Sequence, residues 1–163
     1  MVSDLYVAYS DIGVLYKIND HLNFGPVYRP WWNRTGDTYS LVNRMLFDVN
    51  LKNNFHDFDF SYRMRYQMIM RFSETDPKEY FSRNRLEIKY KGWKLKPFIA
   101  TELYLSLFNT TPYFLDQIRS SLGVEIFVSK HSALMPYFMY IKDKNATDFQ
   151  NQYVFGGGYY LMF

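Results

Sequence analysis

The run FDFSYRMRYQMIMRF at 58–72 alternates so regularly between two kinds of side chain that it constrains the fold more than any other feature. Aromatic residues and methionines occupy its even positions, and polar or charged residues occupy its odd positions, with Ile69 as the single interruption. A repeat of two residues places successive side chains on opposite faces of a β-strand. The run therefore predicts one long strand with an apolar face and a charged face.

The same alternation extends along the chain, and no stretch shows a competing helical period. Strands of soluble proteins usually run ~5–6 residues, whereas a tilted membrane-spanning strand needs about 9–11. These lengths favour an all-β fold, a transmembrane antiparallel up-and-down β-barrel, over a soluble sandwich with its charged faces in water. Turn residues divide the chain into about nine predicted strands, at 5–18, 22–32, 38–52, 56–71, 80–91, 93–107, 116–129, 133–142 and 149–163.

The predicted connections alternate between short and long, as they do in outer-membrane barrels, whose short turns are periplasmic. On this assignment the first and last predicted strands both run inwards. Such barrels have an even number of strands with both ends periplasmic, so we expect ten strands, one of them upstream of residue 1. The chain 1–163 is then a single barrel domain without its signal peptide and first strand. The short turns are predicted at 19–21, 52–56, 91–92 and 129–132.

Composition excludes several other classes of protein. Aromatic residues make up 21% of the chain while mean hydropathy is −0.32, a balance that neither a disordered chain nor a bundle of membrane helices shows. The net charge of +3 is too small to indicate nucleic acid as a partner. The absence of cysteine excludes disulfides, thiolate metal sites and cysteine catalysis.

Residues that could carry catalysis are few. Outer-membrane hydrolases with a serine nucleophile need a histidine within hydrogen-bond reach of it. The three histidines, His21, His56 and His131, fall at separate predicted turns, where solvated turn residues are the plain interpretation. No metal, phosphate-binding or nucleophile motif is present. We therefore expect no enzymatic activity, no cofactor and no metal, with a lipid hydrolase as the least favoured alternative.

Charged residues of both signs share the inward face of the predicted barrel. A narrow barrel fills its lumen with side chains, so the simpler interpretation is a plug of ion pairs that holds the wall together. Because basic residues outnumber acidic ones, a narrow anion-leaning pore is the alternative. A two-residue turn at Lys91 and Gly92 would place Glu87 opposite Lys96. The predicted lumen charges are Arg44, Asp48, Asp59, Arg63, Arg65, Arg83, Arg85, Glu87, Lys96, Glu102, Arg119 and Glu125.

Aromatic residues gather near the ends of the predicted strands, as they do at membrane interfaces. Tyr28, Trp31 and Trp32 lie at the outer end of one strand, while Tyr90 and Trp93 flank an inner turn.

Five stretches resemble a family of outer-membrane β-barrels of unknown function from Bacteroidetes-type Gram-negative bacteria. The resemblance implies a ten-stranded barrel in the bacterial outer membrane, in contact with its lipid, and it implies no activity. The terminal FGGGYYLMF also resembles the signal read by the barrel assembly machinery, with Tyr159, Leu161 and Phe163 in the matching positions. The five stretches are SDIGVLYKINDHLNFGPVYRP, YFSRNRLEIKYKG, LKPFIATELYL, DQIRSSLGVEIFVSK and FGGGYYLMF.

Together these features predict a non-enzymatic integral outer-membrane β-barrel with a charge-filled lumen. Its small size, filled interior and aromatic outer wall suggest an accessory subunit that packs against a larger outer-membrane protein.

Overall fold

Long antiparallel strands make up almost all of the computed structural model, which describes residues 7–35, 38–71, 78–108, 114–144 and 151–161. Three short strands come first, β1 (Val7–Tyr9), β2 (Ile12–Gly13) and β3 (Tyr16–Lys17). The long strands are β4 (Leu22–Thr35), β5 (Thr38–Phe55), β6 (Phe58–Arg71), β7 (Glu79–Tyr90), β8 (Leu95–Leu107), β9 (Leu115–Ser129), β10 (Ser132–Asp143) and β11 (Asn151–Leu161). Among the described residues no helix is long and apolar enough to cross a membrane.

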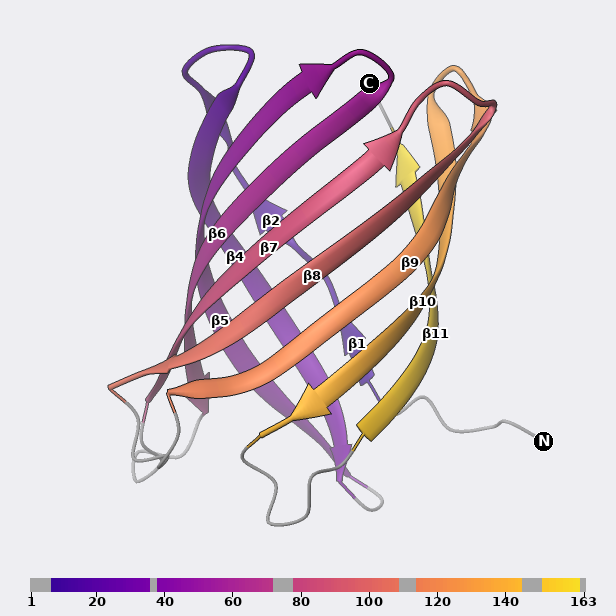
Figure 1. The fold of residues 1–163 in the computed structure, drawn as a ribbon. Helices are drawn as coiled ribbons and strands as arrows, with labels where there is room; N and C mark the ends of the chain where they lie inside the picture. Colours follow the sequence, from indigo (N-terminus) through magenta and orange to yellow (C-terminus); the bar gives the residue numbers. More distant parts are fainter. Residues whose placement is uncertain (1–6, 36–37, 72–77, 109–113, 145–150, 162–163) are drawn as a thin grey trace, which may run out of the picture.

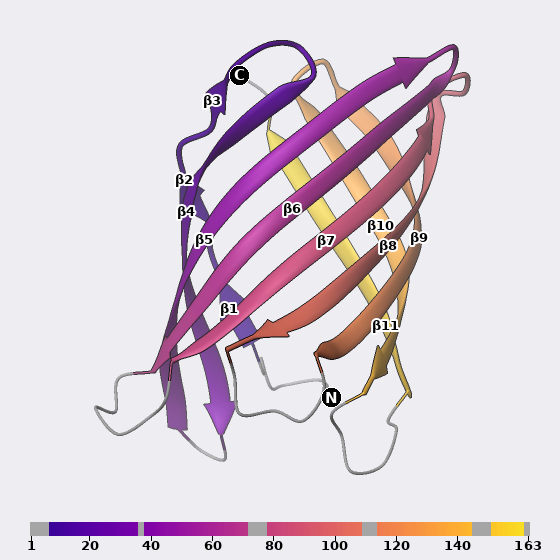
Figure 2. The same cartoon turned by 60° about the vertical axis from the view of Figure 1, so that its left-hand side comes forward.

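The strands form one up-and-down sheet in which each long strand pairs with the next along the chain. β1, β2 and β3 all pair with β4, so together they form one interrupted strand at the edge of the sheet. About nine strands therefore curl into a half-barrel (Figures 1 and 2). No pairing joins β1 to β11 within the described residues, and these two elements form the free edges of the sheet.

Side chains alternate between the two faces of this curved sheet, as the sequence pattern predicts. On β5, Met45 and Phe47 are 52% and 42% exposed, whereas Leu46 and Asp48 are only 3% and 5% exposed. β6 repeats the arrangement, with an exposed Tyr66 between buried Arg65 and Gln67. The convex face therefore carries exposed apolar side chains, and the concave face buries charged and polar ones.

The two ends of the half-barrel differ in their connections. Short turns such as the one at His56 and Asp57 lie at the same end as the close of β11, and the strand ends that the longer connections join lie at the other end (Figure 1). This agrees with the predicted alternation of short and long connections. The longer connections fall partly on residues outside the described ranges.

Two predicted turns are placed wrongly by the sequence pattern. β5 continues to Phe55, so the turn predicted at 52–56 narrows to His56 and Asp57, and His56 adopts a positive φ of 52° there. The turn predicted at 91–92 instead spans the four residues between Tyr90 and Leu95. Glu87 consequently lies opposite Ala100, and not opposite Lys96 as predicted. Lys96 instead faces Glu125 on β9.

Candidate functional site

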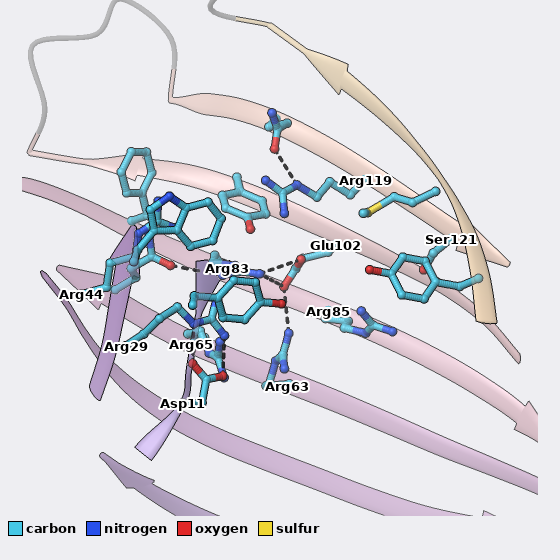
Figure 3. Close-up of a pocket in the computed structure, with 18 of the residues that line it drawn as sticks. Asp11, Arg29, Arg44, Arg63, Arg65, Arg83, Arg85, Glu102, Arg119 and Ser121 are labelled. Carbon is cyan, nitrogen blue, oxygen red and sulfur yellow. Dashed lines mark hydrogen bonds and ion pairs between the residues drawn. The ribbon is translucent and has the colours of Figure 1, made fainter. Parts of the chain in front are cut away.

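A cavity of about 650 Å³ lies against the concave face of the half-barrel (Figure 3). Strands from both sides of the sheet contribute to it, including β1 at one edge and β11 at the other. Seven arginines line it, namely Arg29, Arg44, Arg63, Arg65, Arg83, Arg85 and Arg119. Such a concentration of guanidinium groups in one enclosed space requires compensating charge or hydrogen-bond acceptors.

Two of these arginines each hold a carboxylate with both arms of the guanidinium. Arg65 on β6 donates to both Asp48 oxygens over 2.5 and 2.6 Å, and both residues are buried. Arg29 on β4 donates to both Asp11 oxygens over the same two distances. Paired donors of this planar kind match the carboxylate geometry. The second pair ties the interrupted first strand to β4 through its side chains as well as its backbone.

A third carboxylate, Glu102 on β8, serves two arginines. Arg83 on β7 donates to both of its oxygens at 3.0–3.1 Å, and Arg63 on β6 reaches Oε1 at 3.0 Å. Arg83 also donates to the Gln67 side-chain oxygen at 3.1 Å, and Gln67 is 2% exposed. One negative charge is thus shared between two cations across three strands. The Nε atoms of Arg63 and Arg83 are buried without a hydrogen-bond partner within the described structure.

Arg44 and Arg119 are held by aromatic rings. The Arg44 guanidinium lies 3.9 Å from the centre of the Trp31 ring, and Arg119 lies 4.2 Å from the centre of the Tyr104 ring. Arg119 also donates to the Gln117 oxygen at 2.6 Å. No ion pair joins either arginine to a carboxylate in the part of the chain that the structure describes. Cation–π contacts hold these two charges in place without neutralising them.

A second group of charges lies towards the end of the half-barrel that carries the short turns. Lys89 on β7 contacts Glu125 on β9 at 2.8 Å, across the intervening β8. Glu87 pairs with Arg85 at 2.7 Å, and Lys91 pairs with Asp59 at 2.6 Å. In this second group Arg85, Lys89 and Lys91 each contact a carboxylate. The excess of positive charge is therefore concentrated in the arginine-lined cavity.

Comparison with family models finds a match over residues 2–153, to the family described as protein of unknown function (DUF2490). The match spans most of the 163 residues. The chain belongs to the DUF2490 family. Comparisons with curated proteins and with solved structures found no match.

The twelve predicted lumen charges of this DUF2490 chain all lie on the concave side or in contact with residues there, and none is exposed. The structure brings seven of them to the arginine-lined cavity, namely Arg44, Arg63, Arg65, Arg83, Arg85, Glu102 and Arg119. Asp48 joins them through Arg65. Asp59, Glu87 and Glu125 belong to the second group. Lys96 has its amino group 4.2 Å from the centre of the Phe127 ring.

Asp11, Arg29, Trp31 and Tyr104 of the DUF2490 chain also line the cavity, and the sequence analysis did not predict that they face the lumen. The alternation of side chains along the strands could have found three of them. Arg29 and Trp31 alternate with the outward Tyr28 and Trp32. Tyr104 shares the parity of Glu102 in the same way. Asp11 lies between two short strand segments, and no alternating pattern marks its direction.

Most of the predicted interface aromatics of the DUF2490 chain are on the convex face. Tyr28, Trp32 and Trp93 are exposed, and Tyr90 packs against Trp93 near the turn. Trp31 departs from the prediction, because it turns inward, stacks on Tyr9 and lines the cavity. Adjacent strand residues point to opposite faces, so Trp31 and Trp32 cannot both face outward.

The predicted assembly signal of the DUF2490 chain is described only in part. Tyr159 is 60% exposed on β11. The Leu161 side chain and Phe163 lie outside the described residues.

The three histidines of the DUF2490 chain are exposed at separate turns, as predicted. The His21 ring lies 3.0 Å from the Lys52 carbonyl oxygen. The described residues contain no group of three His, Cys, Asp or Glu side chains that could hold a metal ion.

Proposed function

We propose that this protein is a non-enzymatic integral β-barrel of the bacterial outer membrane. One observation carries the proposal: large apolar side chains are exposed on the convex face while charged ones are buried on the concave face. If the protein were soluble, the same sheet would expose a continuous band of apolar side chains to water. Soluble proteins rarely expose apolar patches of that extent. Against lipid hydrocarbon that belt is buried, and the polar lumen matches the interior of known outer-membrane barrels.

The free edges of the sheet support a larger barrel than the nine described strands form. β1 runs antiparallel to β4, and antiparallel pairing from β4 to β11 makes β1 and β11 run in the same direction. One further antiparallel strand fits between two such edges, whereas direct closure requires a parallel pairing. Unpaired backbone groups are costly in hydrocarbon. We propose a tenth strand at this position.

Within the membrane, we propose that the protein acts as an accessory subunit of a larger outer-membrane assembly. The support is the exposed aromatic wall, which includes Phe155 at 85% and Tyr153 at 67% exposure on β11. Both lie on the strand that forms one free edge of the sheet. Purification from native membranes in mild detergent, followed by native mass spectrometry, tests this role. Recovery with a second outer-membrane protein supports it, and recovery only as a monomer contradicts it.

Membrane insertion is tested separately by fractionation and by mobility on gels. An integral barrel stays in the outer-membrane fraction after alkaline extraction and migrates differently in SDS before and after boiling. A compact, monodisperse protein that stays dissolved without detergent would contradict the proposal.

The second candidate function is a narrow anion-leaning pore. The arginine excess around the cavity favours it, because a basic lining lowers the barrier for anions. Planar bilayer recordings test it through the reversal potential in a potassium chloride gradient. Steady conductance steps whose current reverses near the chloride equilibrium potential support the pore. Inserted protein that gives no conductance contradicts it.

A further inference from the structure

We propose that the arginine-lined cavity is a binding site for a small organic anion, one that carries a phosphate or carboxylate group on an uncharged body. This goes beyond the membrane and subunit proposals, because it assigns a class of ligand to the cavity; its measurement in micelles rests on the proposed membrane location.

Charge counting within the cavity gives the first argument. Seven arginines line it, whereas the carboxylates that line it or bond to those arginines are Asp11, Asp48, Glu87, Glu102 and Asp116. Among the described residues, basic groups therefore exceed acidic groups by two. Positive charge in a partly enclosed protein interior is costly when it is not balanced. A bound anion would supply the missing charge.

The positions of the excess charge give the second argument. Arg44 and Arg119 have no carboxylate partner within the described residues, and they come from β5 and β9, on opposite sides of Arg83 on β7. Figure 3 shows both reaching towards the space around Arg83. The Nε atoms of Arg44, Arg63 and Arg83 are buried donors without a partner among the described groups. Guanidinium forks of this kind recognise phosphate and carboxylate oxygens.

Aromatic support makes these arginines suitable for binding. Trp31 lies under Arg44, and the Tyr104 ring centre is 4.4 Å from the Arg83 guanidinium as well as 4.2 Å from that of Arg119. Side chains already held in one geometry lose less conformational entropy when a ligand binds. The rings thus preorganise the donors.

The opposite wall of the cavity indicates what the rest of the ligand is like. Within the part of β10 and β11 that the structure describes, no charged side chain lines the cavity; the lining residues there are Met135, Tyr137, Met139 and Tyr160. Methionine and tyrosine offer apolar surface with an occasional hydroxyl. A volume of about 650 Å³ lies within the range of small-molecule sites, roughly 300–1,000 Å³. One end of the ligand would face arginines and the other this uncharged wall.

Isothermal titration calorimetry of the purified protein in detergent micelles tests the site. Phenyl phosphate serves as the probe, with inorganic phosphate and phenol as its two halves. We expect one phenyl phosphate per chain, bound about tenfold more tightly than inorganic phosphate, and no measurable binding of phenol. Equal affinity for phenyl phosphate and inorganic phosphate would overturn the role of the uncharged wall. No binding of either at millimolar concentration would overturn the site.

Single substitutions of the cavity arginines test whether phenyl phosphate binds in the cavity. Arg44→Gln and Arg119→Gln should each weaken phenyl phosphate binding by about tenfold, the effect of losing one charged hydrogen bond. Lys94→Gln is the matched control, because Lys94 is an exposed cation in the turn before β8. Equal affinity in all four proteins would show non-specific binding and overturn the proposal.

A further variant keeps the test decisive if Arg44→Gln fails to fold. Arg44→Lys keeps the charge but loses the fork and its stacking on Trp31. We expect an affinity between those of the wild type and Arg119→Gln. Wild-type affinity would contradict the part assigned to Arg44. Heat-modifiable gel mobility confirms folding for each variant, so loss of binding is separable from loss of the barrel.

Discussion

Asp48 and Arg65 stand directly opposite each other on β5 and β6, and two hydrogen bonds join their side chains on the concave face. Both residues are 5% exposed. A buried pair of this kind gains little over an apolar pair of similar shape, yet removing one member leaves the other charge uncompensated. The relationship therefore makes the fold sensitive to the loss of either charge.

The first prediction concerns this pair. Asp48→Asn keeps the side-chain shape but leaves the Arg65 guanidinium buried without its counter-charge. We expect a loss of about 3–5 kcal/mol in the free energy of unfolding. Asp20→Asn is the control, because Asp20 pairs with Lys17 at an exposed turn, and it should change stability little. Urea unfolding in micelles, followed by tryptophan fluorescence, measures both. Similar losses in the two variants would contradict the buried role of Asp48.

The second prediction concerns Gly123 on β9. A Cβ atom there would lie 2.5 Å from the Phe98 ring and 2.7 Å from the Pro136 carbonyl oxygen. Phe98 lies opposite Gly123 in the register and is 2% exposed, so the ring has little room to move. We expect Gly123→Ala to cost about 1–3 kcal/mol of unfolding free energy, the usual range for overpacking.

Gly157 on β11 provides the matched control for Gly123, because a Cβ atom there would meet nothing within 4 Å. Gly157→Ala should leave the unfolding midpoint close to that of the wild type. The same urea titration compares the two variants. A larger loss of stability for Gly157→Ala than for Gly123→Ala would contradict the predicted clash with the Phe98 ring.

The strands and the direction of most side chains could be predicted from the sequence, and the reason is physical. A sheet with one apolar and one polar face repeats its requirements every two residues, so alternation marks both the strand and its faces. The run at 58–72 shows this most clearly, because the structure exposes Tyr62, Met64 and Tyr66 and buries Arg65 and Gln67.

The exact register could not be read from the same pattern. The pairing of β7 with β8 is shifted by four residues from the one predicted, because the last pair is Lys89 with Phe98 and the eight residues between them do not pair across these two strands. An even shift leaves every side chain on its own face, so alternation cannot detect it. The sharing of Glu102 by Arg63 and Arg83 escaped prediction for a related reason. It depends on the curvature of the sheet, which brings β6 and β8 side chains together across β7.

The third prediction concerns a polar pair on the convex face. The Tyr62 hydroxyl donates a hydrogen bond of 2.6 Å to the Asn84 side-chain oxygen on the neighbouring strand. If this face contacts lipid, Tyr62→Phe leaves the Asn84 side-chain oxygen without the hydroxyl that donates to it, and this should cost about 1–3 kcal/mol. Tyr66→Phe is the control on the same face of β6. An equal, small effect of both substitutions would indicate that water reaches Asn84.

The last prediction tests whether the convex face meets hydrocarbon. Ile99 lies within β8 and is 56% exposed, whereas Phe108 follows the end of that strand and is 92% exposed. An arginine on the lipid face costs about 2–4 kcal/mol near the bilayer midplane and roughly 0–1 kcal/mol near the interface. Ile99→Arg should therefore lower the fraction of chains that insert into lipid vesicles, and Phe108→Arg should not. Heat-modifiable mobility after refolding into vesicles measures that fraction. In a soluble sheet both arginines would simply be solvated, so equal yields would argue that water, and not lipid, surrounds β8.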